Sequence, residues 1–173
     1  MLSGKKIFLR ALEPTDLTVL YDWENDVTNW KVSDTITPFS LYTLERYIEQ
    51  AHQDIYTTKQ LRLMICLSEK KEAIGCIDLF DFDLKNSRVG VGILIASAEN
   101  RKQGFASEAL QLLINYVFEI LKIHQLYCTI GVDNEESLLL FKKHDFLISG
   151  IKKDWSATFS GFKDAYFLQL VKK

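Results

Sequence analysis

Several features that would place a chain in a special functional class are missing from this sequence. Lysine and arginine number 21 against 23 aspartates and glutamates, so the formal charge is −2, and no run of like charge exceeds three residues. A basic surface for nucleic-acid phosphates is therefore not expected. The longest apolar stretches fall far short of the ~18 residues that predict a membrane span. We expect a small or cationic partner, with no nucleic acid and no membrane.

Cysteine is also scarce. Cys66, Cys76 and Cys128 are odd in number, far apart, and each lies in an apolar, strand-like run. No Cys-x-x-Cys or Cys/His ligand spacing occurs, which favours buried, reduced thiols and disfavours a metal site. The first six residues lead into a short strand pattern and not into an apolar signal region, so we expect a cytoplasmic protein.

What is present is typical of a globular chain. A composition of 47% hydrophobic and 25% charged residues is ordinary for folded domains, and disordered or fibrous classes are excluded. A length of 173 residues suffices for one domain with its own core. No repeat or shift in composition divides the chain, so we predict one domain over residues 1–173.

The stretch from Val89 to Leu121 organises the prediction. Val89 to Ile95 forms an apolar strand, and after a polar turn Arg101 to Ala106 opens a helix that runs to about Lys122. A glycine turn at a helix start directs several backbone N–H groups into one space, where the positive end of the helix dipole also lies. The pattern predicts a site for an anion.

Two common phosphate-binding motifs do not fit this stretch. In the dinucleotide fingerprint three glycines are spaced G-x-G-x-x-G, but here Gly90 and Gly92 lie inside the strand and Ile95 takes the third place. A P-loop requires Gly-Lys followed by Ser or Thr, whereas Gly104 is followed by Phe105. Both readings fail.

The residues do match the pattern R-x-x-G-x-A, with Arg101, Gly104 and Ala106 at its fixed positions. This pattern resembles the acetyl-coenzyme A signature of the GNAT acyltransferase superfamily. A strand from His124 to Val132 and a helix beginning at Asn134 follow, as in the second half of that family.

Two more segments extend the resemblance. The family closes this helix with Lys-x-Gly-Phe, and here the close reads Lys143-His144-Asp145-Phe146. Residues 8–17 and 21–26 are similar to the branch that contains ribosomal-protein and spermidine N-acetyltransferases. The likeness runs from about Lys6 to Leu170, nearly the whole chain.

The resemblance implies an α+β GNAT fold, with a mixed, mostly antiparallel central sheet flanked by helices. It implies acetyl-CoA as co-substrate and no metal. The residues that would bind the coenzyme are Ile93, Leu94, Ile95, Arg101, Lys102, Gln103, Gly104, Phe105, Ala106, Ser107, Asn134, Phe141 and Lys143.

Each of these positions also has a plainer interpretation. Gly104 and Ala106 let a pyrophosphate approach the backbone, but small residues also suit a tight turn and close helix packing. Asn134 is assigned a hydrogen bond to the pantetheine arm, and its chemistry equally favours a helix N-cap. The two roles are compatible.

Phe141 departs from the family pattern. Four residues after Ser137 the resemblance implies a tyrosine that protonates the departing thiolate, and phenylalanine has no proton to give. Either another group supplies the acid, or the thiolate leaves unaided, or the coenzyme binds without efficient turnover. Ser137 and Tyr127 are the alternative donors, although each is also explained by capping or packing. Val91 lies where many relatives have a glutamate base, so the base is unassigned.

Acidic residues are the candidates for binding an amine. A primary amine is protonated near neutral pH, with a pKa of about 10, so its site must attract a cation and then accept its proton. We select Glu24, Asp81 and Asp83. Alternation along a strand from Ala73 to Asp83 predicts Asp81 and Asp83 on the face of Leu79, and Asp78 opposite with Phe80 and Phe82.

The remaining elements follow from periodicity. One helix begins at Pro14 with Leu17, Leu20 and Tyr21 on one face, and another, amphipathic helix follows Ser40 as N-cap with Leu41, Leu44, Ile48 and Ala51 at helical spacing. Further strands are expected at residues 6–10, 61–67, 147–152 and 165–171.

The sequence therefore predicts an N-acetyltransferase that moves an acetyl group from acetyl-CoA to a small polyamine or a protein N-terminus. The amine would attack directly in a ternary complex, since the cysteines offer no ready covalent relay. The alternative is a catalytically weak module that binds or senses coenzyme A. An exposed edge strand near the C-terminus would permit a homodimer or larger homo-oligomer.

Overall fold

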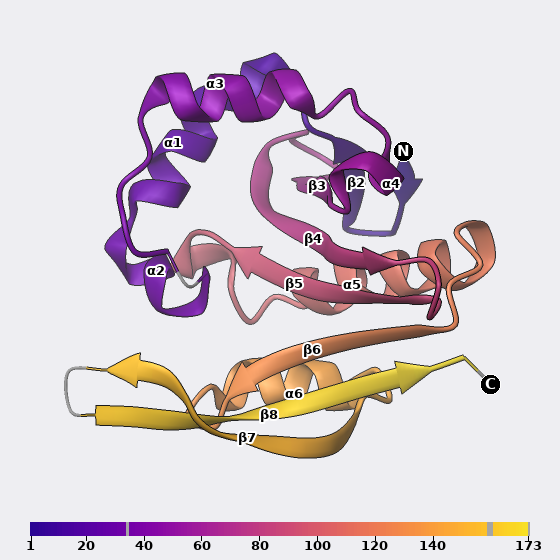
Figure 1. The fold of residues 1–173 in the computed structure, drawn as a ribbon. Helices are drawn as coiled ribbons and strands as arrows, with labels where there is room; N and C mark the ends of the chain where they lie inside the picture. Colours follow the sequence, from indigo (N-terminus) through magenta and orange to yellow (C-terminus); the bar gives the residue numbers. More distant parts are fainter. Residues whose placement is uncertain (34, 159–160, 173) are drawn as a thin grey trace.

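A computed structural model describes residues 1–33, 35–158 and 161–172. Its centre is an eight-stranded sheet of order β1-β2-β3-β4-β5-β6-β8-β7, with helices on both faces (Figure 1). The strands are β1 (Leu2–Ser3), β2 (Ile7–Ala11), β3 (Leu61–Leu67), β4 (Ala73–Asp83), β5 (Arg88–Ile95), β6 (Gln125–Gly131), β7 (Leu147–Thr158) and β8 (Gly161–Val171). The helices are α1 (Leu17–Asn25), α2 (Val27–Ser33), α3 (Leu41–Gln50), α4 (Ile55–Thr58), α5 (Phe105–Asn115) and α6 (Glu135–Lys143), with short turns η1 (Pro14–Asp16), η2 (Ala98–Asn100) and the π-helical η3 (Tyr116–Ile120). The predicted α+β class is confirmed.

Two hydrophobic cores lie on opposite faces of the sheet. On one face, α5 buries Ala109, Leu110 and Leu113 against strand residues that include Ile65 and Ile77. The other face is covered by α1 and α3, whose apolar side chains pack on the alternate strand positions. These are Leu20, Leu44, Ile48, Met64, Cys66 and Cys76. All three cysteines are buried and free, as predicted.

The pairing of β5 with β6 opens the sheet. These strands run parallel and pair only over Arg88–Gly90 and Gln125–Tyr127, while the other strand pairs of the described chain are antiparallel. Beyond Gly90, β5 stays paired with β4, and β6 stays paired with β8. Figure 1 shows the two strands separating in this direction. The separation divides the sheet into two parts, one made of β1 to β5 and the other of β6, β8 and β7.

The helical predictions are confirmed in part. The helix after Gly104 begins at Phe105 and continues through η3 to Ile120. Ser40 caps α3, because its hydroxyl accepts the N–H of Thr43 at 3.1 Å. Leu41, however, is 51% exposed. Helices α2 and α4 are too short for a clear apolar period and were not predicted. In the part of the chain that is described, no helix is both long and apolar enough to cross a membrane.

The predicted faces of β4 are wrong at its end. Asp81 has φ +52°, and the register with β5 shifts between Phe80 and Asp83. The extra residue of this bulge reverses the alternation. Phe82 therefore joins Leu79 in the core beneath α5, where the simple period had placed Asp81 and Asp83.

The last two strands are longer than predicted. β7 and β8 form a hairpin in which the register shifts twice along β7. Its polar residues pair across the hairpin: Asp164 accepts the N–H of Asp154 at 3.0 Å and Lys153 Nζ at 2.7 Å. Bulges and polar pairs allow a strand without a simple apolar alternation, so periodicity missed both extensions.

Candidate active site

A cavity of about 470 Å³ lies beside the second half of β5 and between the N-terminal turns of α5 and α6. Helix α2 borders it through Thr28 and Asn29. The remaining lining residues are Ile93, Leu94, Ile95, Asn100, Arg101, Lys102, Gly104, Phe105, Ala106, Ser107, Asn134, Glu136, Ser137, Leu139 and Leu140. Its walls thus come from β5, from the turn that leads into α5, and from helices α2, α5 and α6.

The turn before α5 is held in a left-handed conformation. Lys102 has φ +60°, and Gly104, the N-cap, has φ +87°. A Cβ on Gly104 would meet open space, since its nearest neighbour would be Lys6 Nζ at 4.0 Å. The backbone angle and not crowding therefore favours glycine. The first N–H groups of α5 have no intrahelical acceptor and are available to a ligand at this end of the cavity.

Three cations surround this turn. The Arg101 guanidinium donates to the carbonyls of Ile95 at 3.0 Å and Ala96 at 3.1 Å, and to Asn29 Oδ1 at 3.4 Å. Lys6 Nζ donates to the Gln103 carbonyl at 3.2 Å. Lys102 forms an exposed ion pair with Glu136 at 2.9 Å, and this hydrogen bond lowers the pKa of Glu136. The cations fix the turn and leave a positive end to the cavity.

The opposite wall begins with a capped helix. Asn134 Oδ1 accepts the N–H of Ser137 at 3.1 Å, so the predicted N-cap is confirmed. At the other end of α6, Asp145 stands where the family has glycine and adopts φ +63°. Aspartate tolerates this left-handed region better than most residues, which explains how the close is kept without glycine.

The structure brings most of the predicted coenzyme residues together around this cavity, and the candidate proton donor Ser137 also lines it. Three do not line it. Phe141 is 3% exposed and packs edge-on against Phe146, with ring centroids 5.0 Å apart. The Lys143 side chain is exposed, and Gln103 instead binds Lys6 and the Glu99 carbonyl.

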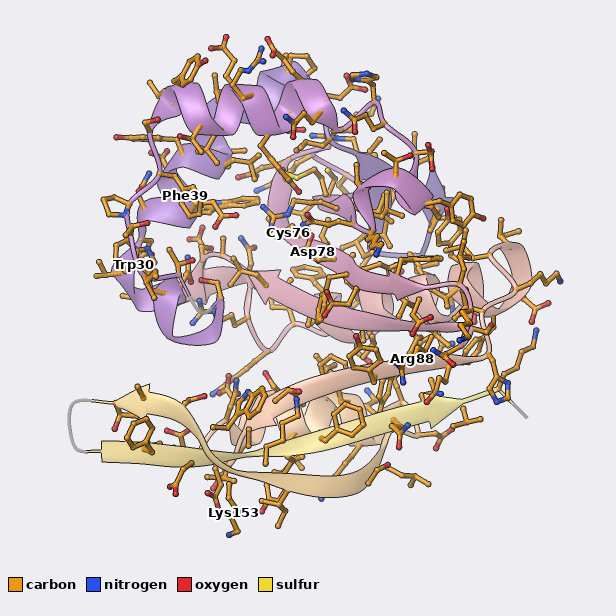
Figure 2. All side chains as sticks on the ribbon, viewed as in Figure 1. Trp30, Phe39, Cys76, Asp78, Arg88 and Lys153 are labelled. Carbon is orange, nitrogen blue, oxygen red and sulfur yellow. The ribbon has the colours of Figure 1, made fainter. Side chains whose placement is uncertain are left out.

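The candidate amine residue Glu24 belongs to a polar cluster under α1 and α3. Arg62 Nη1 donates to Glu24 Oε1 at 2.5 Å, while its Nε and Nη2 hold both oxygens of Asp78 at 2.8 and 2.9 Å. The Tyr47 ring lies 5.5 Å from the Arg62 guanidinium. Figure 2 labels Asp78 and Cys76 beside β4, and Cys76 packs in the core that contains Leu20 of α1 and Leu44 of α3.

The charges of this cluster act on one another. Burial is the largest influence on Arg62 and opposes its charge, but the Asp78 carboxylate and the other groups around it together outweigh burial, so the pKa of Arg62 lies well above its usual value. Burial raises the pKa of Tyr47 to about 12. One cation between two carboxylates leaves the cluster with a net charge of −1.

Aromatic side chains cross the same sheet face where β5 and β6 last pair. Tyr127 lies between Phe80 and Phe167, with centroid distances of 6.3 and 5.6 Å. Burial, followed by the charge of Asp81, raises the pKa of Tyr127. Tyr127 does not line the cavity between β5, α5 and α6.

Asp81 and Asp83 line a second, smaller cavity of about 370 Å³ with Tyr56, Lys59, Phe82 and Leu84. Asp83 is already committed, because it binds Asn86 and Arg88. Its hydrogen bonds to Asn86 lower its pKa. The three candidate amine residues therefore do not share one pocket.

Sequence reasoning missed several residues of both regions. Asn29 was missed because it reaches the cavity from α2, which was not predicted. Glu136 lies in α6 two residues after Asn134, and this nearness to the predicted cap could have indicated it. Arg62 and Asp78 could have been found, since directly paired strand positions of opposite charge are a signal for an ion pair. Glu24 joins them across 38 residues of sequence separation, and no local pattern indicates that contact.

Comparison with known proteins now adds to this geometry. Residues 6–147 match the acetyltransferase (GNAT) domain family. The chain is 29% identical over 173 residues to an uncharacterized N-acetyltransferase, p20, of Bacillus licheniformis, covering 99% of this chain and 96% of that protein.

Two solved structures share the fold. Spermidine N-acetyltransferase from Vibrio cholerae, in complex with CoA and spermine, superimposes with a TM-score of 0.87 at 21% identity, covering 97% of this chain and 96% of that one. A dodecameric structure of spermidine N-acetyltransferase from the same organism gives 0.80 at 22%, covering 97% and 95%. The chain belongs to the GNAT family of N-acetyltransferases.

Proposed function

We propose that this N-acetyltransferase binds acetyl-CoA in the cavity between β5, α5 and α6 and transfers the acetyl group to a primary amine on the Tyr127 face of the sheet. The observation that carries the proposal is the position of the cavity. It lies where β5 and β6 part, and the left-handed glycine turn forms one end. A thioester threaded between the strands would have access to both faces.

Each end of the cavity suits a different part of the coenzyme. The free N–H groups of α5 and the charges of Arg101 and Lys102 fit the pyrophosphate. The unpaired edge of β5 from Val91 to Ile95 offers backbone groups to the amide-containing pantetheine arm, as an added strand would use them. Asn134 and Ser137 face that arm from α6.

The other face suits an amine. The cluster of Arg62, Glu24 and Asp78 has a net charge of −1, and Asp81 adds an exposed carboxylate beside Tyr127. Aromatic rings and carboxylates together favour an alkylammonium ion. A small polyamine is the acceptor we favour, and the similarity to a fold solved with spermine agrees with this choice.

We assign the chemistry to direct attack. The ammonium group first loses one proton, and the free amine nitrogen bonds to the thioester carbon. The carbon–sulfur bond then breaks, the nitrogen loses a second proton, and coenzyme A leaves as a thiolate that takes one proton while the other passes to solvent. Burial raises the pKa of Cys76 to about 12, so this thiol stays protonated at neutral pH and is a poor nucleophile for a covalent relay. We assign the proton that the thiolate takes to Tyr127 or Ser137, the two candidate donors near the point where β5 and β6 separate.

The alternative, a weak coenzyme-binding module, has one observation in its favour. The position that would supply the acid holds Phe141, buried and without a hydroxyl. Incubation with acetyl-CoA and a panel of amines, read by thiol release and by mass spectrometry of the amine, separates the two. We expect acetylated polyamine. Coenzyme binding without an acetylated product from any amine would support the module.

We also propose that copies of the chain associate through the β7 edge of the sheet. β7 is an edge strand that exposes Leu147, Ile151 and Trp155. The dodecameric relative shows that this fold can assemble. Light scattering after gel filtration tests the proposal, and a monomer at micromolar concentration would contradict it.

A further inference from the structure

A histidine that no part of the proposed mechanism uses reaches the cavity wall from the end of α6. His144 Nε2 lies 2.8 Å from Ser107 Oγ, and its Nδ1 lies 3.2 Å from Gln111 Oε1. The Gln111 amide nitrogen donates to Asn115 at 3.0 Å, which turns its oxygen toward the histidine. Nδ1 therefore carries the proton in neutral His144, and Nε2 accepts the hydroxyl proton of Ser107.

Few charges act on this histidine. Its pKa is lowered, first by burial and then by Lys143, while Asp145 opposes the shift. From α5 it meets the uncharged Ser107 and Gln111, because Glu108 is turned to the backbone N–H groups of Lys5 and Lys6. The neutral form is therefore the state of His144 at neutral pH in the free protein.

Ser107 links His144 to a ligand in the cavity, since Ser107 lines the cavity in the first turn of α5. A serine hydroxyl has one proton to donate. If the Ser107 hydroxyl donates that proton to an anionic oxygen in the cavity, Nε2 of neutral His144 loses its donor, and its lone pair then faces a lone pair of Ser107 Oγ. A protonated His144 would instead donate to Ser107 Oγ and bring a positive charge toward the anion.

We propose that Ser107 and His144 form a proton-linked grip on the coenzyme diphosphate, in which Ser107 donates to the phosphate while His144 takes up a proton and donates to Ser107. The inference rests on the proposed function, because it requires the diphosphate at the α5 end of the cavity. It makes His144 a positioning residue that acts through Ser107.

The sign of the effect follows from linkage. A ligand that favours protonated His144 raises its pKa in the complex above the lowered value in the free protein. Binding then tightens as the pH falls through the pKa of the complex and levels off below the pKa of the free protein. One linked proton limits the change to about tenfold in Kd per pH unit.

The test uses calorimetry with 3′-dephospho-CoA at pH 5.5 to 8, in buffers of different ionisation enthalpy. This probe keeps the diphosphate but lacks the 3′-phosphate, whose own ionisation near pH 6 would obscure the signal. For the parent protein we expect a Kd that tightens severalfold between pH 7.5 and 6, with a proton uptake of at most one per ligand that is greatest between the pKa of the complex and the pKa of the free protein. Both should disappear in His144→Gln and in Ser107→Ala.

His52→Gln and His124→Gln are the matched controls, because these are the other two histidines of the chain and both are exposed. They should keep the proton uptake of the parent. Uptake that is equal in the parent, His144→Gln and Ser107→Ala would overturn the inference, as would binding by the parent without uptake. Absence of binding to both CoA and dephospho-CoA at every pH would instead overturn the proposed function itself. Should His144→Gln fail to fold, Ser107→Ala carries the test alone.

Discussion

The cavity that we propose for the coenzyme, between β5, α5 and α6, and the sheet face that we propose for the amine, with Arg62, Asp78 and Tyr127, are built in different ways. We call them the coenzyme-side cavity and the amine-side face. The cavity draws most of its lining from three short stretches of chain: 93–95, 100–107 and 134–140. Its key features are backbone angles and helix ends. The amine-side face is made of side chains from α1, α3, β3, β4 and β6, and its charges are largely paired with one another. Backbone-built sites follow local sequence, whereas side-chain networks depend on the whole fold.

The largest effect should come from the amine-side network. Replacing Arg62 with Met removes the cation between Asp78 and Glu24 and leaves two partly buried carboxylates without their partner. Breaking such a pair costs about 3–5 kcal/mol, so the free energy of unfolding in urea should fall by that amount. Arg46→Met is the control, because Arg46 pairs with Glu49 at an exposed site. Equal stability of the two variants would show that the network is no firmer than a surface ion pair.

The next largest effect concerns the glycine turn. Gly104→Val puts a β-branched side chain at φ +87°, and such strain costs about 1–3 kcal/mol. If the turn relaxes to a negative φ, the α5 amides no longer converge, and calorimetric affinity for CoA should fall roughly 10- to 100-fold.

Gly150→Ala is its control, since a Cβ there meets no atom within 4 Å and Gly150 is not among the positive-φ glycines. It should bind CoA as the parent does. Unchanged affinity for CoA in Gly104→Val would show that the turn does not bind the coenzyme. The cavity would then not be a site built from backbone angles.

Phe141→Tyr tests whether a tyrosine hydroxyl at position 141 can protonate the departing thiolate. The ring packs on Phe146 in the core beneath α5, and so the new hydroxyl would be buried there. We expect a loss of roughly 1–2 kcal/mol in unfolding free energy and no gain in kcat. A rise in kcat with unchanged affinity for CoA would show instead that position 141 reaches the reacting sulfur.

The smallest effect separates the two aspartates of the β4 bulge. Asp81 is exposed beside Tyr127, but Asp83 is bound to Asn86 and Arg88. Asp81→Asn should raise the KM for a polyamine about threefold and leave the KM for acetyl-CoA unchanged, as expected for one screened charge. Asp83→Asn should change neither KM. A polyamine KM that rises in Asp83→Asn and stays unchanged in Asp81→Asn would instead place the amine beside Asp83.

These contrasts explain what could be predicted from sequence. Gly104, Asn134 and the strand before them carry local signals, namely a turn, a cap and an apolar run, and the structure brings them together in one cavity. The bulge at Asp81 could not be predicted, because a single left-handed aspartate leaves no trace in an alternating pattern. The contact between Ser107 and His144 could not be predicted either, since the two residues are 37 positions apart in the sequence. Local backbone features could thus be predicted from the sequence, whereas contacts made by tertiary packing could not.

The most direct test of the central claim is to find which backbone amides respond when CoA is added. Titration of ¹⁵N-labelled protein should shift the resonances of residues 93–95, 103–107 and 134–137 most strongly. Those of Tyr56, Lys59 and Leu84, which line the other cavity, should stay unchanged. Saturable shifts confined to the first set are the result that we predict. Shifts gathered around Leu84, or none at CoA concentrations that suffice for acetyl transfer, would contradict the account.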